Sequence, residues 1–102
     1  MPIERNRHKR IMSDYERSLV FYAQKYVVSQ LAKKASKEMV GFIWGSKNPD
    51  LGPDEYRLTI QKGKKKLVFP FTKDELIEDY GSTKWKTRLL IRVNEIFRRL
   101  ET

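Results

Sequence analysis

The residues of this sequence whose type and spacing could do chemistry are basic, and the chemistry they favour is the binding of polyanions. The 102 residues include 22 Lys+Arg and 13 Asp+Glu, which gives a formal net charge of +9. A field of this sign attracts nucleic acid, an anionic lipid surface or an acidic protein. Because such a charge can also serve solubility alone, the charge by itself leaves that simpler interpretation open.

The densest basic cluster lies in the middle of the chain. Its members are Lys62, Lys64, Lys65 and Lys66. No acidic residue occurs from Arg57 to Lys73, and Arg57 falls on the same outward strand face as Lys64 and Lys66. A projecting basic ribbon of this kind can follow phosphates or enter a nucleic-acid groove. The alternative, given about equal weight, is that the lysines discourage edge-to-edge pairing of strands.

A second basic group recurs at helical spacing near the C-terminus. It consists of Lys84, Arg88, Arg92 and Arg99. Guanidinium groups on one side of a helix could bind phosphates bidentately. A solvated helix face is the slightly favoured alternative, because Glu95 lies among these residues and would pair with arginine locally. A third basic stretch, residues 1–12, is predicted to be a mobile arm that could also follow a phosphate backbone, with a solvated terminus that binds no partner as an equally supported alternative.

The composition argues against enzymatic chemistry. There is no cysteine, and the single histidine, His8, lies in the charged N-terminal run, so nucleophile–histidine pairs and thiolate or multi-histidine metal sites are excluded. The acidic cluster of residues 74–79 is explained by capping of a helix. We therefore expect no catalytic residues, no metal site, no cofactor and no enzyme. No apolar run approaches the roughly 20 residues of a membrane helix, and no segment resembles a signal peptide, so a cytoplasmic protein without membrane contact is expected.

The lysine cluster requires a β-hairpin to position it. Alternation of apolar and polar residues over 55–71 predicts two strands with one buried face. A two-residue turn at Lys62-Gly63, in which Gly63 supplies a positive φ, sets Leu58 opposite Leu67. The same register sets Tyr56 opposite Phe69. The second strand contains Pro70 and is therefore predicted to be an edge, while Phe42-Ile43-Trp44 is a candidate third strand.

An N-terminal helix is predicted to begin at the capping box of Ser13 and Glu16 and to run to about Val40, with Gly41 as its C-cap. Its apolar residues surround most of the circumference. This pattern indicates a helix buried on more than one side, or one shared with a second chain. The β-branched and aromatic content of residues 19–28 leaves a strand as an open alternative.

Two further helices are predicted at the C-terminus. The capping box of Thr72 and Glu75 begins a helix over 73–80 that ends at Gly81, and Ser82 or Thr83 caps a final helix that reaches Leu100. One apolar side of this helix is formed by Trp85, Leu89, Val93, Ile96 and Leu100. The spacing is similar to a helix-turn-helix, with Lys84, Trp85 and Arg88 at the start of a reading helix, but ordinary helix packing is favoured.

These observations predict an α+β fold in which an antiparallel hairpin, with or without a third strand, packs against one N-terminal and two C-terminal helices. Residues 13–102 are expected to form a single domain. The leading functional hypothesis is a non-enzymatic nucleic-acid-binding protein with weak sequence preference, for DNA or RNA. The alternative is a protein-interaction subunit that is homodimeric through helix 13–40 and binds an acidic partner. Candidate nucleic-acid contacts are Arg57, Lys62, Lys64, Lys65, Lys66, Lys84, Arg88, Arg92 and Arg99.

Overall fold

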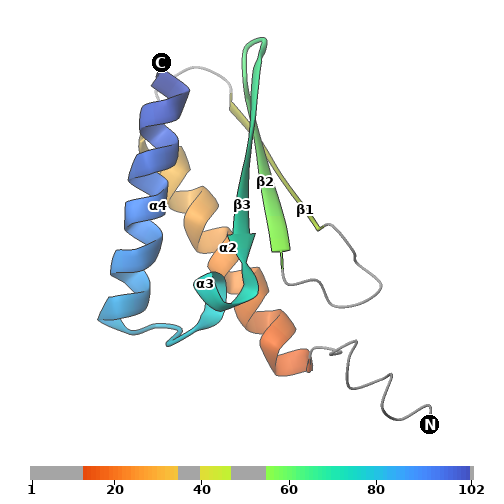
Figure 1. The fold of residues 1–102 in the computed structure, drawn as a ribbon, viewed down its shortest axis with the longest axis vertical. Coiled ribbons are helices and arrows are strands. Elements are labelled where there is room, and N and C mark those ends of the chain that lie inside the picture. The colour runs from red at the N-terminus through yellow and green to blue at the C-terminus, as the bar shows by residue number, and fades with distance from the viewer. Residues whose placement is uncertain (1–12, 35–39, 47–54, 102) are drawn as a thin grey trace, which may run out of the picture.

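A computed structural model describes residues 13–34, 40–46 and 55–101. The elements follow the order α2 (Asp14–Lys34), β1 (Val40–Ser46), β2 (Glu55–Lys62), β3 (Lys65–Thr72), α3 (Lys73–Ile77) and α4 (Thr83–Glu101). The strands form one antiparallel sheet in the order β1-β2-β3, and the helices pack beside it (Figure 1). The predicted α+β class and the third strand are therefore confirmed. The predicted arm, residues 1–12, lies outside the described residues.

The start of α2 follows the sequence prediction, whereas the predicted C-cap at Gly41 is wrong. Ser13 Oγ accepts a hydrogen bond from the Glu16 amide at 3.1 Å, and the Ser13 amide donates to Glu16 Oε1 at 3.3 Å, which completes the capping box. The described helix ends at Lys34, and Gly41 is a strand residue rather than its C-cap. The prediction of a helix to Val40 is wrong because the segment 40–44, four of whose five residues are β-branched or aromatic, pairs with β2 instead.

The core lies between the sheet and the helices. Helix α2 contributes Val20, Ala23, Val27 and Leu31 from one side. Helix α4 contributes Trp85, Leu89, Val93, Ile96 and Leu100, the five positions of the predicted apolar side. The inward face of the hairpin contributes Tyr56, Leu58, Ile60, Phe69 and Phe71. Burial of each large apolar side chain contributes about 1.5–3 kcal/mol, so these three sets hold the layers together.

The hairpin has the predicted faces and a different register. Leu58 pairs with Phe69 and Tyr56 with Phe71, so the predicted pairing of Leu58 with Leu67 is wrong. The turn consists of Gly63 and Lys64, one residue later than predicted. Moving a two-residue turn by one position shifts the cross-strand partner by two residues. Because side chains alternate with a period of two, the buried face is unchanged.

The turn chemistry explains this register. Gly63 has φ of 62°, whereas Lys64 is not among the described residues with positive φ. This is the pattern of a type II′ turn, which requires glycine at the first central position. The predicted loop, Lys62-Gly63, instead places Gly63 at the second central position. The edge position of β3, which contains Pro70, is confirmed by the strand order.

Helix α3 is shorter than predicted. It ends at Ile77, and residues 78–82 form a turn in which Asp79 and Gly81 have φ of 55° and 86°. The predicted helix over 73–80 is therefore too long. The left-handed conformation of Asp79 prevents the helix from continuing to residue 80. The Thr72 hydroxyl caps α3 by accepting from the Glu75 amide at 3.0 Å, and Ser82 Oγ caps α4 by accepting from the Trp85 amide at 3.1 Å.

Replacement of Gly63 tests the turn assignment. We expect Gly63→Ala to lower the free energy of unfolding by about 1 kcal/mol, because a Cβ disfavours the positive φ that this turn position requires. No atom lies within 4 Å of an added Cβ, so the cost comes from the backbone alone. The control is Lys64→Ala, which needs no positive φ. The free energies of unfolding can be measured by urea denaturation. Equal values for the two variants would contradict the assignment of Gly63 to the turn position with positive φ.

Candidate nucleic-acid interface

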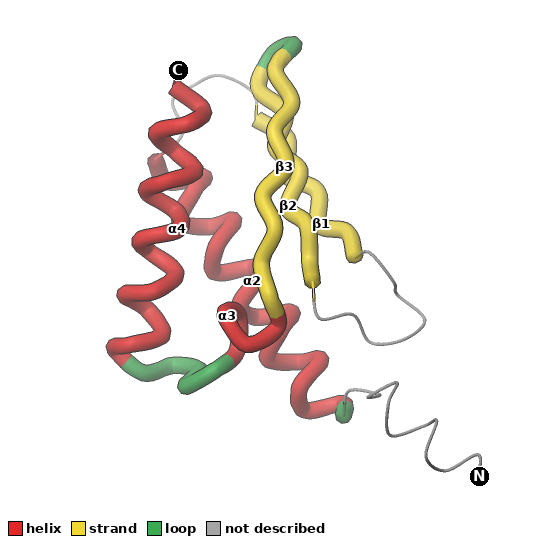
Figure 2. Tube along the Cα trace, in the orientation of Figure 1, coloured by secondary structure: helices red, strands yellow, loops and turns green. Residues whose placement is uncertain are grey.

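Basic residues from three elements gather at one end of the molecule. Helices α2 and α4 run in the same direction, and both end on the side to which the hairpin tip points (Figures 1 and 2). The last turns of the two helices carry lysines and arginines, and the tip carries the lysine cluster. We call this region the basic end, and its members are Lys33, Lys34, Lys62, Lys64, Lys65, Lys66, Arg98 and Arg99.

Most acidic residues of the described ranges lie at the opposite end, which we call the acidic end. They occur in the first turn of α2, at the start of β2, and in α3 with its following turn. Its members are Asp14, Glu16, Glu55, Asp74, Glu75, Glu78 and Asp79. The basic end contains one acidic residue of the described helix α4, Glu101, at the C-terminus of that helix. Basic residues also lie at the acidic end, where Arg17, Arg57 and Lys73 form ion pairs with Asp14, Glu55 and Glu16. Positive charge is therefore concentrated at the basic end, whereas the acidic and basic groups of the acidic end largely balance each other.

Contacts at the hairpin tip connect it to the end of α4. Lys65 Nζ donates to the Arg99 carbonyl at 3.4 Å, and the Arg99 guanidinium lies 5.4 Å from the centroid of the Phe69 ring. Lys62 and Lys65 form a cross-strand pair on the inward face and are half-buried. Lys64 and Lys66 are exposed. These two lysines are the tip residues most accessible to a ligand.

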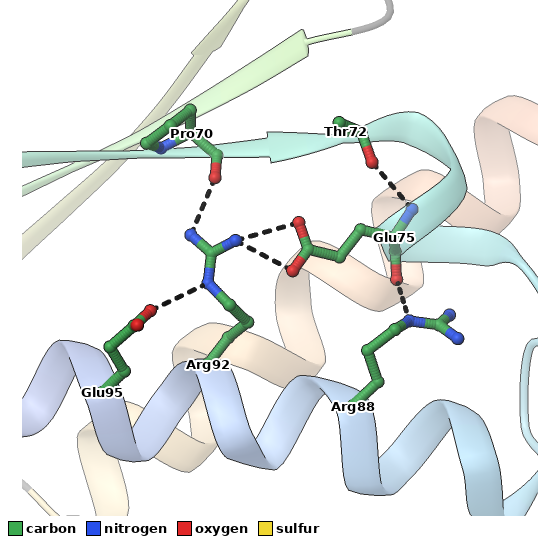
Figure 3. A network of polar contacts seen from close by, with 6 residues as sticks. All are labelled: Pro70, Thr72, Glu75, Arg88, Arg92 and Glu95. Carbon is green, nitrogen blue, oxygen red and sulfur yellow. Dashed lines mark hydrogen bonds and ion pairs between the residues drawn. The ribbon is translucent and has the colours of Figure 1, made fainter.

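Arg92 occupies the centre of a polar network rather than a solvated stripe (Figure 3). Its Nη1 donates to both carboxylate oxygens of Glu75, at 3.0 and 2.8 Å, and its Nη2 donates to the Pro70 carbonyl at 2.8 Å. Nε lies 3.3 Å from Glu95 Oε1, and the guanidinium lies 4.2 Å from the centroid of the Phe71 ring. Both terminal nitrogens of Arg92 therefore already have hydrogen-bond partners within the chain, while its buried Nε is ion-paired with Glu95 and makes no hydrogen bond within the described residues.

Two neighbouring side chains of α4 bind the carbonyls at the end of α3. Arg88 donates through Nε to the Glu75 carbonyl at 3.0 Å and through Nη2 to the Glu78 carbonyl at 2.7 Å. Trp85 is buried, and its Nε1 donates to the Leu76 carbonyl at 2.6 Å. Since Trp85 belongs to the core and Arg88 caps α3, the start of α4 does not present these residues as a helix-turn-helix reading surface would.

The predicted nucleic-acid contacts thus divide into separate groups. The tip lysines and Arg99 lie together at the basic end. Lys84 lies at the first turn of α4, and Arg57 lies on the outward sheet face, where its Nε is 3.4 Å from Glu55 Oε1. Arg88 and Arg92 join α4 to α3 and β3. Sequence reasoning omitted Lys33, Lys34 and Arg98 from the candidate contacts, although the basic last turn of each helix could have indicated them.

No other constellation in the described residues points to catalysis or metal binding. A shallow groove beside α4 is lined by Glu75, Lys84, Thr87, Arg88, Ile91 and Arg92. Its charged members include the two arginines already engaged with α3 and β3. Within the ranges described, no group of three His, Cys, Asp or Glu side chains could hold a metal ion, and no helix is long and apolar enough to cross a membrane.

Comparison with protein-family models, with curated proteins and with solved structures finds no match for this chain.

The Glu75–Arg92 ion pair can be used to test whether Arg92 has a structural role. We expect Glu75→Gln to lower the free energy of unfolding by about 1–3 kcal/mol, because Arg92 would lose its partner at a position where both side chains are mostly buried. The matched control is Glu95→Gln, whose carboxylate is 55% exposed and whose removal should cost about 0.5 kcal/mol or less.

A double-mutant cycle with Arg92→Met isolates the interaction. We expect a coupling energy of about 1–2 kcal/mol between Glu75 and Arg92 from urea denaturation of the four proteins. Additive effects of the two substitutions would contradict the assigned role.

Proposed function

We propose that this protein is a non-enzymatic nucleic-acid-binding module that binds phosphates through its basic end. The observation that carries the proposal is the convergence of the α2 terminus, the α4 terminus and the hairpin tip on one end of the molecule. Most acidic groups of the described ranges lie at the other end. A concentrated field of one sign attracts a polyanion more strongly than the same charges dispersed over the surface.

The residue types at the basic end favour phosphate contacts over base contacts. Six of its eight members are lysines (Lys33, Lys34, Lys62, Lys64, Lys65 and Lys66), whose ammonium groups act as point charges on flexible stems. Contacts of this kind position a protein on a nucleic acid without reading its sequence. The binding should therefore depend steeply on salt and weakly on sequence.

The proposed interface leaves out part of the sequence-based set. Arg88 and Arg92 are excluded because their donors bind carbonyls and carboxylates within the chain. Lys84 and Arg57 are excluded because they lie toward the acidic end. Lys33, Lys34 and Arg98 are added because they share the end of the molecule with the tip lysines.

Charge removal at the tip tests the proposal. For the double variant Lys64→Ala/Lys66→Ala, we expect weaker binding to a fluorescently labelled duplex and to a single-stranded probe at low salt. Anisotropy titrations at several salt concentrations should give a log–log slope that is smaller by about 2, because each lost phosphate contact reduces it by about one.

The matched control is Lys84→Ala/Lys86→Ala. It removes the same charge from exposed positions at the start of α4, and we expect it to leave the salt slope within about 0.5 of the wild-type value. Equal losses in both double variants would show that only net charge matters. That result, or binding that is indifferent to salt, would overturn the proposal.

A second candidate function, a protein-interaction subunit, is favoured by the outward face of α2. Tyr15, Phe21 and Tyr22 are 72%, 54% and 53% exposed, and Lys25 Nζ lies 5.2 Å from the centroid of the Phe21 ring. Exposed aromatic side chains beside a lysine suit a protein partner that carries acidic groups. They also explain why the apolar residues of this helix surround its axis while one side alone enters the core.

The homodimer predicted through this helix can be tested with Phe21→Ser/Tyr22→Ser. If α2 forms the dimer contact, wild-type protein should sediment as a dimer and this variant as a monomer at the same concentration, because the exposed rings would supply most of the buried apolar area. Circular dichroism should show an unchanged fold, since neither ring belongs to the core.

A further inference from the structure

Within the described residues, the strand β1 carries neither a charged side chain nor a proline on its outer edge. An unpaired strand edge offers a row of N–H and C=O groups to another strand, and proteins protect it with charged residues or proline. The segment Val40–Ser46 contains neither. In the part of the chain that the structure describes, β1 has β2 on one side and no strand on the other.

The opposite edge of the same sheet is protected. Strand β3 contains Pro70, which has no amide hydrogen, and the Pro70 carbonyl already accepts from Arg92 at 2.8 Å. Lys65 and Lys66 add charge at the tip end of this strand. The two edges have similar lengths, so the difference between them lies in residue choice rather than in size.

The residues of β1 are self-complementary about Ile43. In an antiparallel pair centred on Ile43, this residue faces its own copy, Phe42 faces Trp44, and Gly41 faces Gly45. These five central positions therefore meet residues of similar size and type, while Val40 faces Ser46 at the ends of the strand. Ile43 is 68% exposed on the outward face, whereas Phe42 and Trp44 are partly buried on the inward face. Cross-strand aromatic and β-branched pairs of this kind stabilise a sheet.

We infer that a second copy of this chain adds to the sheet along β1, antiparallel and centred on Ile43. The two copies then share one continuous sheet, with both sets of helices on the same face, because directly opposed residues point the same way. The outward row of Ile43, Thr59 and Val68 continues across the seam. The contact is isologous, as in most homodimers.

The positions of the tip lysines favour the antiparallel orientation of the second copy. Strand β1 starts beside Lys62, at the basic end, and finishes beside Tyr56, next to Glu55 at the acidic end. An antiparallel seam therefore places the lysine-rich hairpin tips of the two copies at opposite ends of the shared sheet. A parallel arrangement would place like charges together, so the electrostatics favour the orientation that the residue pattern requires.

A cysteine at the centre of the seam provides a direct test. The chain contains no cysteine, so Ile43→Cys introduces a single thiol. Directly opposed residues of an antiparallel pair have Cα atoms about 4.5–5.5 Å apart, which suits a disulfide. We expect mild oxidation to convert most of this variant into a covalent dimer on non-reducing gels. The control Val68→Cys, exposed on the same face of β3, should stay monomeric.

Charge insertion gives an independent measurement. We expect Ile43→Lys to raise the dimer dissociation constant by at least about tenfold in sedimentation equilibrium, since like charges would face each other across the seam. Val68→Lys adds the same charge on the same sheet face and should leave the constant unchanged. Both positions are exposed, so neither substitution should prevent folding, which thermal denaturation checks.

Three results would overturn the inference. They are wild-type protein that stays monomeric at every concentration measured, equal cross-linking of the two cysteine variants, and dissociation by Phe21→Ser/Tyr22→Ser with no effect of Ile43→Lys. The last result would assign the contact to α2 instead. Nucleic-acid binding plays no part in these measurements, so their outcome is independent of the proposed function.

Discussion

The docking of α4 against the short helix α3 is the constraint on which the arrangement depends. A helix of five residues satisfies few of its own carbonyls. Trp85 and Arg88 donate to carbonyls of α3 and the turn that follows it, and Arg92 reaches the Pro70 carbonyl of β3. These bonds fix the direction in which α4 leaves the turn. That direction brings its basic last turn to the hairpin tip.

Features with a local cause could be predicted from the sequence. The capping residues Ser13 and Thr72 and the buried side of α4 follow from neighbouring residues alone, and the structure confirms them. The turn register could not be predicted in the same way, because Gly63 satisfies either of two adjacent turn types. The end of α2 depended on competition between helix propagation and pairing of residues 40–44 with β2, which is a tertiary effect.

The candidate site shows the same division between local and tertiary information. The lysine cluster was evident from composition, and its place at a hairpin tip followed from alternation. The roles of Arg88 and Arg92 were not predictable, because their partners are backbone carbonyls and a carboxylate that only the fold brings close. Likewise, Lys33 and Arg98 lie far apart in sequence, and only the common direction of α2 and α4 places them at one end.

The bond from Arg92 to the Pro70 carbonyl has a further consequence for how this sheet can grow. Hydrogen bonding along β3 is interrupted at Pro70, where the nitrogen carries no hydrogen and the oxygen is already engaged. Addition of a strand at the β3 edge is therefore disfavoured, and the sheet can be extended only at the β1 edge. Assembly through strand pairing would stop once two molecules had met, so an open-ended fibre is not the expected product.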